Sequence, residues 1–336
     1  MAIFLQWDKS IQEAYMNKQS RMKRAVQNYK TELTMLGVFC VFFAVMSIVS
    51  PNFLSSQNML NVASQVSANA MLSVGMTLVI ITGGIDLSVG GILGLSGMIG
   101  SILMVQTKNS VVGFITIMAV ALICGLINGI LIGYIKMPAF IVTLGMMNIC
   151  RSLDYVISDA NTQSGFPQSW QFIGKQRVMG IPMYLILMVI VFIIFAFILQ
   201  KTKFGRFLYA CGSNADAAKL SGINVRWNVC AAYIVCGFMC GIAAWIMTSR
   251  MMACDPTYGS IAEMDAIAAA VIGGTSMSGG KGTIGGTVVG IFLVGFLRNA
   301  LNLLGINPYW QGSALGAVIV VAVLAERISR MRHKKA

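Results

Sequence analysis

The stretch IPMYLILMVIVFIIFAFIL at residues 181–199 contains no charged side chain, and neither does LTMLGVFCVFFAVMSIV at residues 33–49. A membrane-spanning helix needs roughly 17–25 mostly apolar residues to cross about 30 Å of hydrocarbon, and both stretches have that length. The whole chain of 336 residues is 57% hydrophobic and only 10% charged, whereas in soluble domains about 25% of residues are charged. The sequence therefore predicts an all-α integral membrane protein.

Apolar windows of this kind recur along the chain and predict about ten transmembrane helices. They lie at residues 33–49, 59–81, 88–106, 111–135, 138–157, 181–199, 228–249, 265–280, 283–303 and 311–325. Glycines crowd the eighth window, so we expect a broken or re-entrant element there. The predicted transmembrane domain covers residues 31–326. A basic segment, residues 1–30, precedes it as a surface helix or a disordered tail, and a basic tail, residues 327–336, follows it.

The basic residues predict how the chain is oriented, because Lys and Arg concentrate in the cytoplasmic loops of membrane proteins. With a cytoplasmic N-terminus and ten spans, eighteen of the 24 Lys and Arg residues fall on the cytoplasmic side, and only Lys108, Lys175, Arg177 and Arg250 fall outside. We therefore expect both termini in the cytoplasm. The formal net charge of +13 is better explained by this topology than by a nucleic-acid-binding patch.

Small and polar residues inside the predicted spans indicate how the helices pack and what they enclose. Glycines at four-residue spacing, such as Gly125, Gly129 and Gly133, predict close helix contacts. Polar side chains in the spans could line a path for a neutral polar solute. The candidates for this pathway are Gln65, Asn69, Asn148 and Arg151. Arg151 also lies three residues before Asp154, so neutralisation on one helix face is an alternative role for this arginine.

The sequence offers no recognisable catalytic, metal or cofactor site. Its eight cysteines form no Cys-x-x-Cys pair, and His333 is the only histidine, so metal, Ser-His and Cys-His chemistry are not expected. The run GGTSMSGGKGT at residues 273–283 looks like a phosphate-binding loop but fails in register, because Thr275 stands where the first glycine is needed and Gly282 follows Lys281. We expect no enzyme activity, so the energy for concentrating a solute is expected to come from another subunit.

The longest predicted cytoplasmic loop, residues 201–228, is the candidate docking place for such a subunit. Ser213 or Asn214 can cap a short helix over residues 216–220, and Gly222 suits the left-handed position that ends many helices. A capped helix between two spans would form a rigid projection. A surface turn without a partner is the alternative.

Several motifs resemble the ribose-type permease subunits of bacterial ATP-binding-cassette importers for monosaccharides, and the resemblance runs from about residue 33 onward. The motifs are GIDLSVG at 84–90, GSNADAAKLSGI at 212–223, DAIAA at 265–269, the glycine-rich run at 273–282 and NLLG at 302–305. The resemblance implies that the loop at 201–228 contains the element that couples to the ATPase. The candidate coupling residues are Gly212, Asn214, Ala217, Ala218 and Gly222.

The same resemblance implies three protein partners: a second permease copy, a cytoplasmic ATP-binding subunit and an external sugar-binding protein. It implies a multi-pass protein of the bacterial inner (plasma) membrane, surrounded by lipid and without a nucleic-acid partner. The implied function is ATP-driven import of ribose or another pentose or hexose. Import of branched-chain amino acids or nucleosides by the same architecture is one alternative. A stand-alone secondary transporter or channel is another.

Overall fold

The computed structural model describes residues 30–307, 310–313, 316–317, 320 and 324. The predicted basic segment 1–30, the last predicted span and the tail 327–336 therefore lie wholly or mostly outside the described residues. Long apolar runs form helices because hydrocarbon offers no hydrogen-bond partners, so backbone groups pair within the segment. The long helices are α2 (Lys30–Val49), α3 (Ser56–Ile81), α4 (Val89–Thr107), α5 (Ser110–Gly129), α6 (Ala139–Ser158), α8 (Met183–Lys201), α11 (Val225–Met251) and α13 (Ile284–Leu303).

Seven of the helices in the described part of the chain are long and apolar enough to cross a membrane. They are α3, α4, α5 with its π-helical extension η1 (Ile130–Tyr134), α6, α8, α11 and α13. Helix α2 carries a shorter apolar stretch, Phe39–Val49. The prediction of an all-α membrane protein agrees with this architecture, whereas the number of ten spans stays a prediction.

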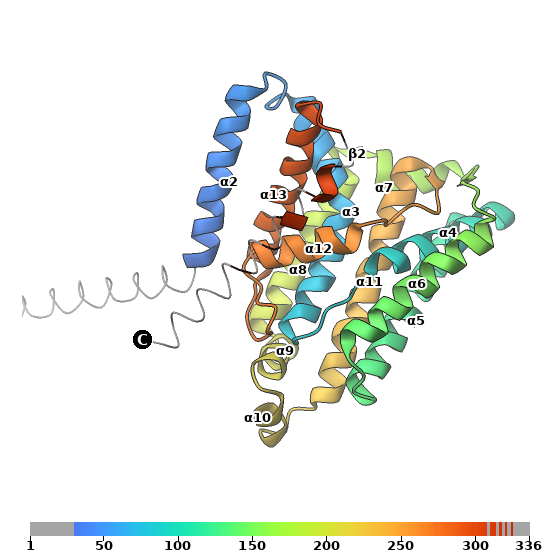
Figure 1. Ribbon diagram of the computed structural model, residues 1–336. Helices are drawn as coiled ribbons and strands as arrows, with labels where there is room; N and C mark the ends of the chain where they lie inside the picture. The colour runs from blue at the N-terminus through green and yellow to red at the C-terminus, as the bar shows by residue number, and fades with distance from the viewer. Residues whose placement is uncertain (1–29, 308–309, 314–315, 318–319, 321–323, 325–336) are drawn as a thin grey trace, which may run out of the picture.

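Helices α3 and α11 lie in the middle of the bundle, with α4, α5 and α6 on one side and α8 and α13 on the other (Figure 1). Helix α11 packs against α3, α4 and α5, while α3 also contacts α8, α12 and α13. Most of α3 is buried, whereas α6 and α8 expose apolar side chains along much of their length. Exposed apolar faces of this kind suit contact with lipid, which needs no polar partner.

The close contact between α5 and α11 depends on the predicted glycine ridge. A Cβ atom at Gly125 would lie 2.7 Å from the carbonyl oxygen of Tyr233, and one at Gly133 would lie 2.6 Å from that of Arg226. Only a residue without a side chain lets the two backbones approach so closely. The predicted packing role of Gly125 and Gly133 is confirmed.

Polar pairs hold α3 against α13. The side-chain amides of Asn58 and Asn299 exchange hydrogen bonds of 3.0 and 2.7 Å, and the hydroxyls of Thr77 and Thr287 lie 2.7 Å apart. All four residues are buried. In a membrane, where apolar contact alone does not draw helices together, such pairs help to select one helix partner over another.

The eighth predicted span folds as the broken element expected from its glycines. Helix α12 (Ala262–Ile272) has 11 residues, and a turn over residues 273–283 joins it to α13. In Figure 1, α12 runs across the direction of the long helices rather than along it. Its backbone lies directly against α13, because a Cβ atom at Gly290 would meet the carbonyl oxygen of Ala269 at 2.0 Å.

Short elements mark the two ends of the bundle. One end, here the α10 end, holds α9 (Lys203–Ser213) and α10 (Ala215–Leu220), and the other, here the α7 end, holds α7 (Phe172–Lys175) (Figure 1). The remaining short elements are η2 (Gln168–Gln171), β1 (Gln163–Ser164), β2 (Arg177–Val178), β3 (Ile181–Pro182) and β4 (Ala253–Cys254). Strand β1 pairs antiparallel with β4, and β2 with β3.

Candidate functional site

The α10 end has the capped helix that the sequence predicts. The Oδ1 atom of Asn214 accepts a hydrogen bond of 3.0 Å from the backbone N–H of Ala217, which caps α10. Gly222 follows the helix with a φ of 80°, a left-handed conformation that favours glycine. The local structure predicted for residues 214–222 is confirmed.

The candidate coupling residues divide into exposed and packed groups. Asn214, Ala217 and Gly222 are exposed. Ala218 is only 4% exposed, so its methyl group packs inward, one residue from the exposed Ala217, and its coupling role stays a prediction. Leu220, which sequence reasoning missed, is 90% exposed. A large apolar side chain in water at the end of a short helix is the feature that a partner protein would cover.

Gly212, the remaining candidate, is packed against another part of the chain. A Cβ atom there would lie 1.8 Å from the carbonyl oxygen of Ile81 and 2.7 Å from the backbone nitrogen of Gly280. Its role in the fold is therefore to let α9 approach the end of α3 and the turn before α13.

A second group of polar and charged side chains surrounds the first turn of α12. Glu263 forms an ion pair with Arg151 of α6, with Arg151 Nη2 lying 2.9 and 3.1 Å from the two carboxylate oxygens. The Glu263 side chain is 8% exposed and the Arg151 side chain 35%. The guanidinium thus partly faces the surface of the single chain, while the carboxylate is enclosed.

The second carboxylate of α12 joins two further helices. Asp265 accepts a hydrogen bond of 2.6 Å from Arg298 of α13 through Oδ1, and one of 2.8 Å from the Asn69 amide of α3 through Oδ2. The Asp265 side chain is 3% exposed, whereas that of Arg298 is 31% exposed. We call Asn69, Arg151, Glu263, Asp265 and Arg298 the α12 charge cluster.

Two of the four predicted pathway residues belong to this cluster and two do not. Asn69 and Arg151 lie in it. Gln65 is exposed on α3, and Asn148 is exposed on α6, where its amide donates to the carbonyl oxygen of Leu144 in the same helix. The structure does not support the alternative in which Arg151 pairs with Asp154: Asp154 is 2% exposed and its carboxylate faces Gly94 of α4, at 2.6 Å from where a Cβ atom would stand.

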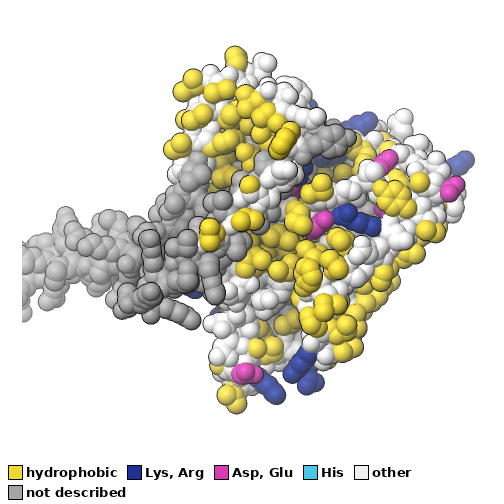
Figure 2. Space-filling model, viewed as in Figure 1, with side chains coloured by type: hydrophobic (Ala, Val, Ile, Leu, Met, Phe, Trp, Pro, Cys, Tyr) yellow, Lys and Arg dark blue, Asp and Glu magenta, His cyan; other side chains and the backbone are white. Residues whose placement is uncertain are grey.

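The α12 charge cluster excludes lipid from part of the surface. Charged groups inside a membrane cost several kcal/mol, about 2.5–3.5 on insertion scales, so they face protein or water. Figure 2 shows basic and acidic side chains next to one another at mid-height, among hydrophobic side chains. The face that carries the partly exposed guanidiniums of Arg151 and Arg298 is therefore suited to an aqueous path or to another protein.

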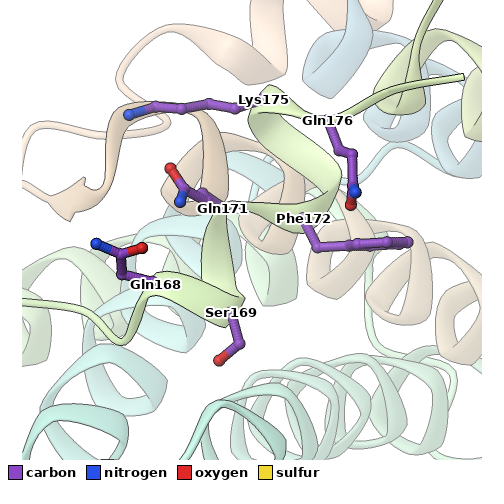
Figure 3. Close-up of a pocket in the computed structure, with 6 residues that line it drawn as sticks. All are labelled: Gln168, Ser169, Gln171, Phe172, Lys175 and Gln176. Carbon is purple, nitrogen blue, oxygen red and sulfur yellow. The ribbon is translucent and has the colours of Figure 1, made fainter.

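At the α7 end, a hollow of about 580 Å³ opens to the surface (Figure 3). It is lined by Gln168, Ser169, Gln171, Phe172, Lys175 and Gln176, which come from η2, α7 and the residue after α7. Most of these side chains are amides or hydroxyls, and none of the predicted pathway residues is among them. The hollow is therefore separate from the α12 charge cluster.

The same end contains an ordered carboxylate in the loop between β4 and α12. Hydrogen bonds from Thr162 and Thr257 hold the pKa of Asp255 below its usual value. The Thr162 contact ties this loop to β1. No group of three or more His, Cys, Asp and Glu side chains suited to a metal ion occurs within the described residues.

Comparison with known proteins connects this architecture to transport. Residues 58–323 match the family described as "Branched-chain amino acid transport system / permease component". The ribose import permease protein RbsC of Bacillus subtilis (strain 168) is 42% identical over 294 residues, which cover 87% of this chain and 91% of that protein.

Two relatives from Escherichia coli (strain K12) are named for other sugars. The D-allose transport system permease protein AlsC is 36% identical, over 87% of this chain and 90% of its own length. The galactose/methyl galactoside import permease protein MglC is 33% identical, over 91% of this chain and 99% of its own length. No solved structure matches the chain. The family match spans most of the chain, as do the relatives, so this chain belongs to the permease-component family and is a multi-pass protein of the bacterial plasma membrane.

Proposed function

We propose that this chain is the membrane-spanning subunit of an ATP-driven importer for a monosaccharide. The observation that carries the proposal is the likeness to permeases named for ribose, allose and galactose, at 33–42% identity over 87–91% of the chain. A pentose or hexose is neutral and rich in hydroxyl groups. Amide, carboxylate and guanidinium side chains of the α12 charge cluster have the chemistry to hydrogen-bond such a solute.

The orientation proposed from charge places the α10 end in the cytoplasm and the α7 end outside. Lys201, Lys203, Arg206 and Lys219 all lie at or near the α10 end, and Lys and Arg favour the cytoplasmic side. In this orientation α10 offers Leu220 to an ATP-binding subunit. The polar hollow at the α7 end faces the external sugar-binding protein that delivers the solute.

The proposed pathway passes the α12 charge cluster. Asn69 and Arg151 already contact its carboxylates, while Gln65 and Asn148 are exposed on α3 and α6. A second permease copy facing Arg151 and Arg298 would enclose these partly exposed guanidiniums between two proteins and away from lipid. The proposed assembly is therefore a dimer of permeases with the pathway between them.

Reconstitution tests the proposal. The permease, its ATP-binding partner and its solute-binding protein are placed in proteoliposomes with internal ATP, and uptake of labelled ribose, allose, galactose, leucine and adenosine is measured. We expect concentrative uptake of one of the sugars, dependent on ATP and on both partners. Concentrative uptake by the permease alone would instead identify a secondary transporter and overturn the proposal.

Branched-chain amino acids are the second candidate cargo, because the family description names them. A zwitterion brings its own ammonium and carboxylate groups, which the paired acids and arginines of the α12 charge cluster could also bind. Leucine uptake without sugar uptake in the same experiment would favour this candidate. Adenosine uptake alone would favour the nucleoside alternative.

A further inference from the structure

The glycine-rich run that fails as a phosphate loop forms a tight turn between α12 and α13. We call residues 279–282 the glycine turn. The backbone N–H of Ser276 donates to the carbonyl oxygen of Lys281 at 3.0 Å and closes the turn. Gly279 and Gly280 have φ values of 80° and 73°, where a side chain would be strained. The sequence of the glycine turn is thus explained by backbone geometry and close packing.

The glycine turn lies directly on α9, the helix that carries the proposed coupling helix α10. The hydroxyl of Tyr209 donates a hydrogen bond of 2.6 Å to the carbonyl oxygen of Gly282. A Cβ atom at Gly280 would lie 2.9 Å from the Cα atom of Ser213. Gly212 and Ser213, the residues immediately before the α10 cap, are therefore in backbone contact with the glycine turn.

The end of α3 completes this contact. The backbone N–H of Gly280 donates a hydrogen bond of 2.9 Å to the carbonyl oxygen of Ile81, the last residue of α3. The same carbonyl oxygen is the atom that leaves no room for a side chain at Gly212. Helix α9, the glycine turn and α3 thus meet at one point with no side chain between their backbones.

Two helices, α3 and α12, connect this meeting point to the α12 charge cluster. Helix α3 carries Asn69, and α12, which begins with the cluster, leads through residues 273–278 into the glycine turn. Helix α12 is fixed at its other end by the pairs of Glu263 and Asp265 with arginines of α6 and α13. Because closely packed protein interiors transmit displacement rather than absorb it, a shift of α9 would act on α3 and α12 together.

An open groove lies beside the contact. A groove of about 550 Å³ opens between the end of α8, α9 and the start of α13, with Tyr209, Arg206, Gly285 and Gly286 among its lining residues. The hydroxyl of Tyr209 therefore forms its bond to Gly282 at the edge of an open space. The face of α9 that carries Arg206 and Tyr209 therefore borders open space rather than a packed helix.

We propose that Tyr209 and Gly212 are positioning residues for transport, which form, with the glycine turn, a second coupling contact behind α10. The contact carries the displacement of α9 and α10 to α3 and α12. This inference rests on the proposed function, because it assumes that an ATP-binding subunit moves α10. It assigns to the run at 273–283 a mechanical role in place of nucleotide binding.

Tyr209→Phe tests the contact, because it removes one hydroxyl and keeps the ring. The reconstituted complex is assayed for co-purification of the ATP-binding subunit, ATP hydrolysis and sugar uptake. We expect the subunit to stay bound and hydrolysis to persist, while the sugar imported per ATP falls roughly fivefold, the size expected for loss of about one net hydrogen bond. The matched control is Tyr134→Phe on η1, at the same end but outside the contact, which should leave this ratio unchanged.

A second variant keeps the test independent of one hydroxyl. Gly212→Ala should lower the amount of sugar imported per ATP further than Tyr209→Phe does. The thermal midpoint of this variant is compared with that of the unmodified permease to check that it is folded. An unchanged ratio in Tyr209→Phe, or loss of the ATP-binding subunit from that variant, would overturn the proposed transmission role. Failure of the unmodified complex to import sugar with ATP would instead refute the importer assignment, so the two failures are distinct.

Discussion

The pair formed by Arg151 and Glu263 allows a prediction at the scale of single residues. Glu263→Gln leaves the guanidinium without its charged partner, and we expect a loss of about 1–3 kcal/mol in the free energy of unfolding. Arg151→Met combined with Glu263→Leu removes both charges and should cost less than the single change. Thermal unfolding of the purified permease in detergent measures both. A double variant less stable than Glu263→Gln would contradict this explanation.

Two adjacent glycines offer a matched test of backbone packing. A Cβ atom at Gly286 would lie 1.9 Å from the carbonyl oxygen of Gly273, whereas one at Gly285 would meet no atom within 4 Å. Gly286→Ala should therefore lower the thermal midpoint. Gly285→Ala should leave it unchanged or raise it slightly, because alanine favours a helix over glycine by roughly 0.5–1 kcal/mol. Equal effects of the two changes would show that the contact between Gly273 and Gly286 does not matter.

At this scale the sequence predicts which polar side chains are unusual but not which ones meet. Asn69 and Arg151 stand out because polar groups are rare in spans. Their carboxylate partners, Asp265 and Glu263, lie more than a hundred residues away in the chain. Local spacing reveals only neighbours on the same helix, which is why Asp154 is the partner that the sequence offers for Arg151 as an alternative to a pathway role. Asp265 at the start of the eighth window and Glu263 two residues before it were the available signal.

At the scale of elements, we predict that transport depends on the exposed apolar end of helix α10. Leu220→Glu replaces the exposed apolar side chain with a charged one. We expect sugar uptake to fall roughly tenfold or more, because a central apolar contact of an interface often contributes above 1.4 kcal/mol to binding. The measurement is sugar uptake in proteoliposomes at equal permease content.

The matched control for Leu220→Glu is Ile135→Glu, at another loop of the same end. Ile135 is 60% exposed and follows η1. We expect near-normal uptake from it. Full activity of Leu220→Glu would remove α10 from the proposed interface with the ATP-binding subunit.

The elements themselves were predictable to different degrees. Long apolar runs, such as the one that forms α8, predict both the helix and roughly where it begins and ends. In hydrocarbon a single segment can pair its backbone hydrogen-bonding groups only by forming a helix. The α10 cap at Asn214 also follows from local chemistry. The inward direction of Ala218 does not, because it depends on how α10 rests on its neighbours. The crossing direction of α12 likewise depends on contacts with α3, α6 and α13.

The orientation of the whole molecule leads to a labelling prediction. Cys40 is the only exposed cysteine in the described part of the chain, so Cys40→Ser provides a background with little reactive thiol there. Met179, 98% exposed at the α7 end, and Leu220 are then changed singly to cysteine. In intact spheroplasts, a membrane-impermeant maleimide should label Met179→Cys and spare Leu220→Cys. The reverse pattern would invert the proposed topology.

The short length of α12 has a consequence for how the protein enters the membrane. Its 11 residues rise about 16 Å, roughly half the thickness of the hydrocarbon. An insertion machinery that releases helices one by one would find no stable place for α12, which carries two acidic groups and cannot reach both surfaces. Its entry depends on α6 and α13 already supplying their arginines. We therefore expect α12 to settle only after α6 and α13 are in place, and defects in Glu263 or Asp265 to appear as poor assembly in the cell before they appear as poor transport.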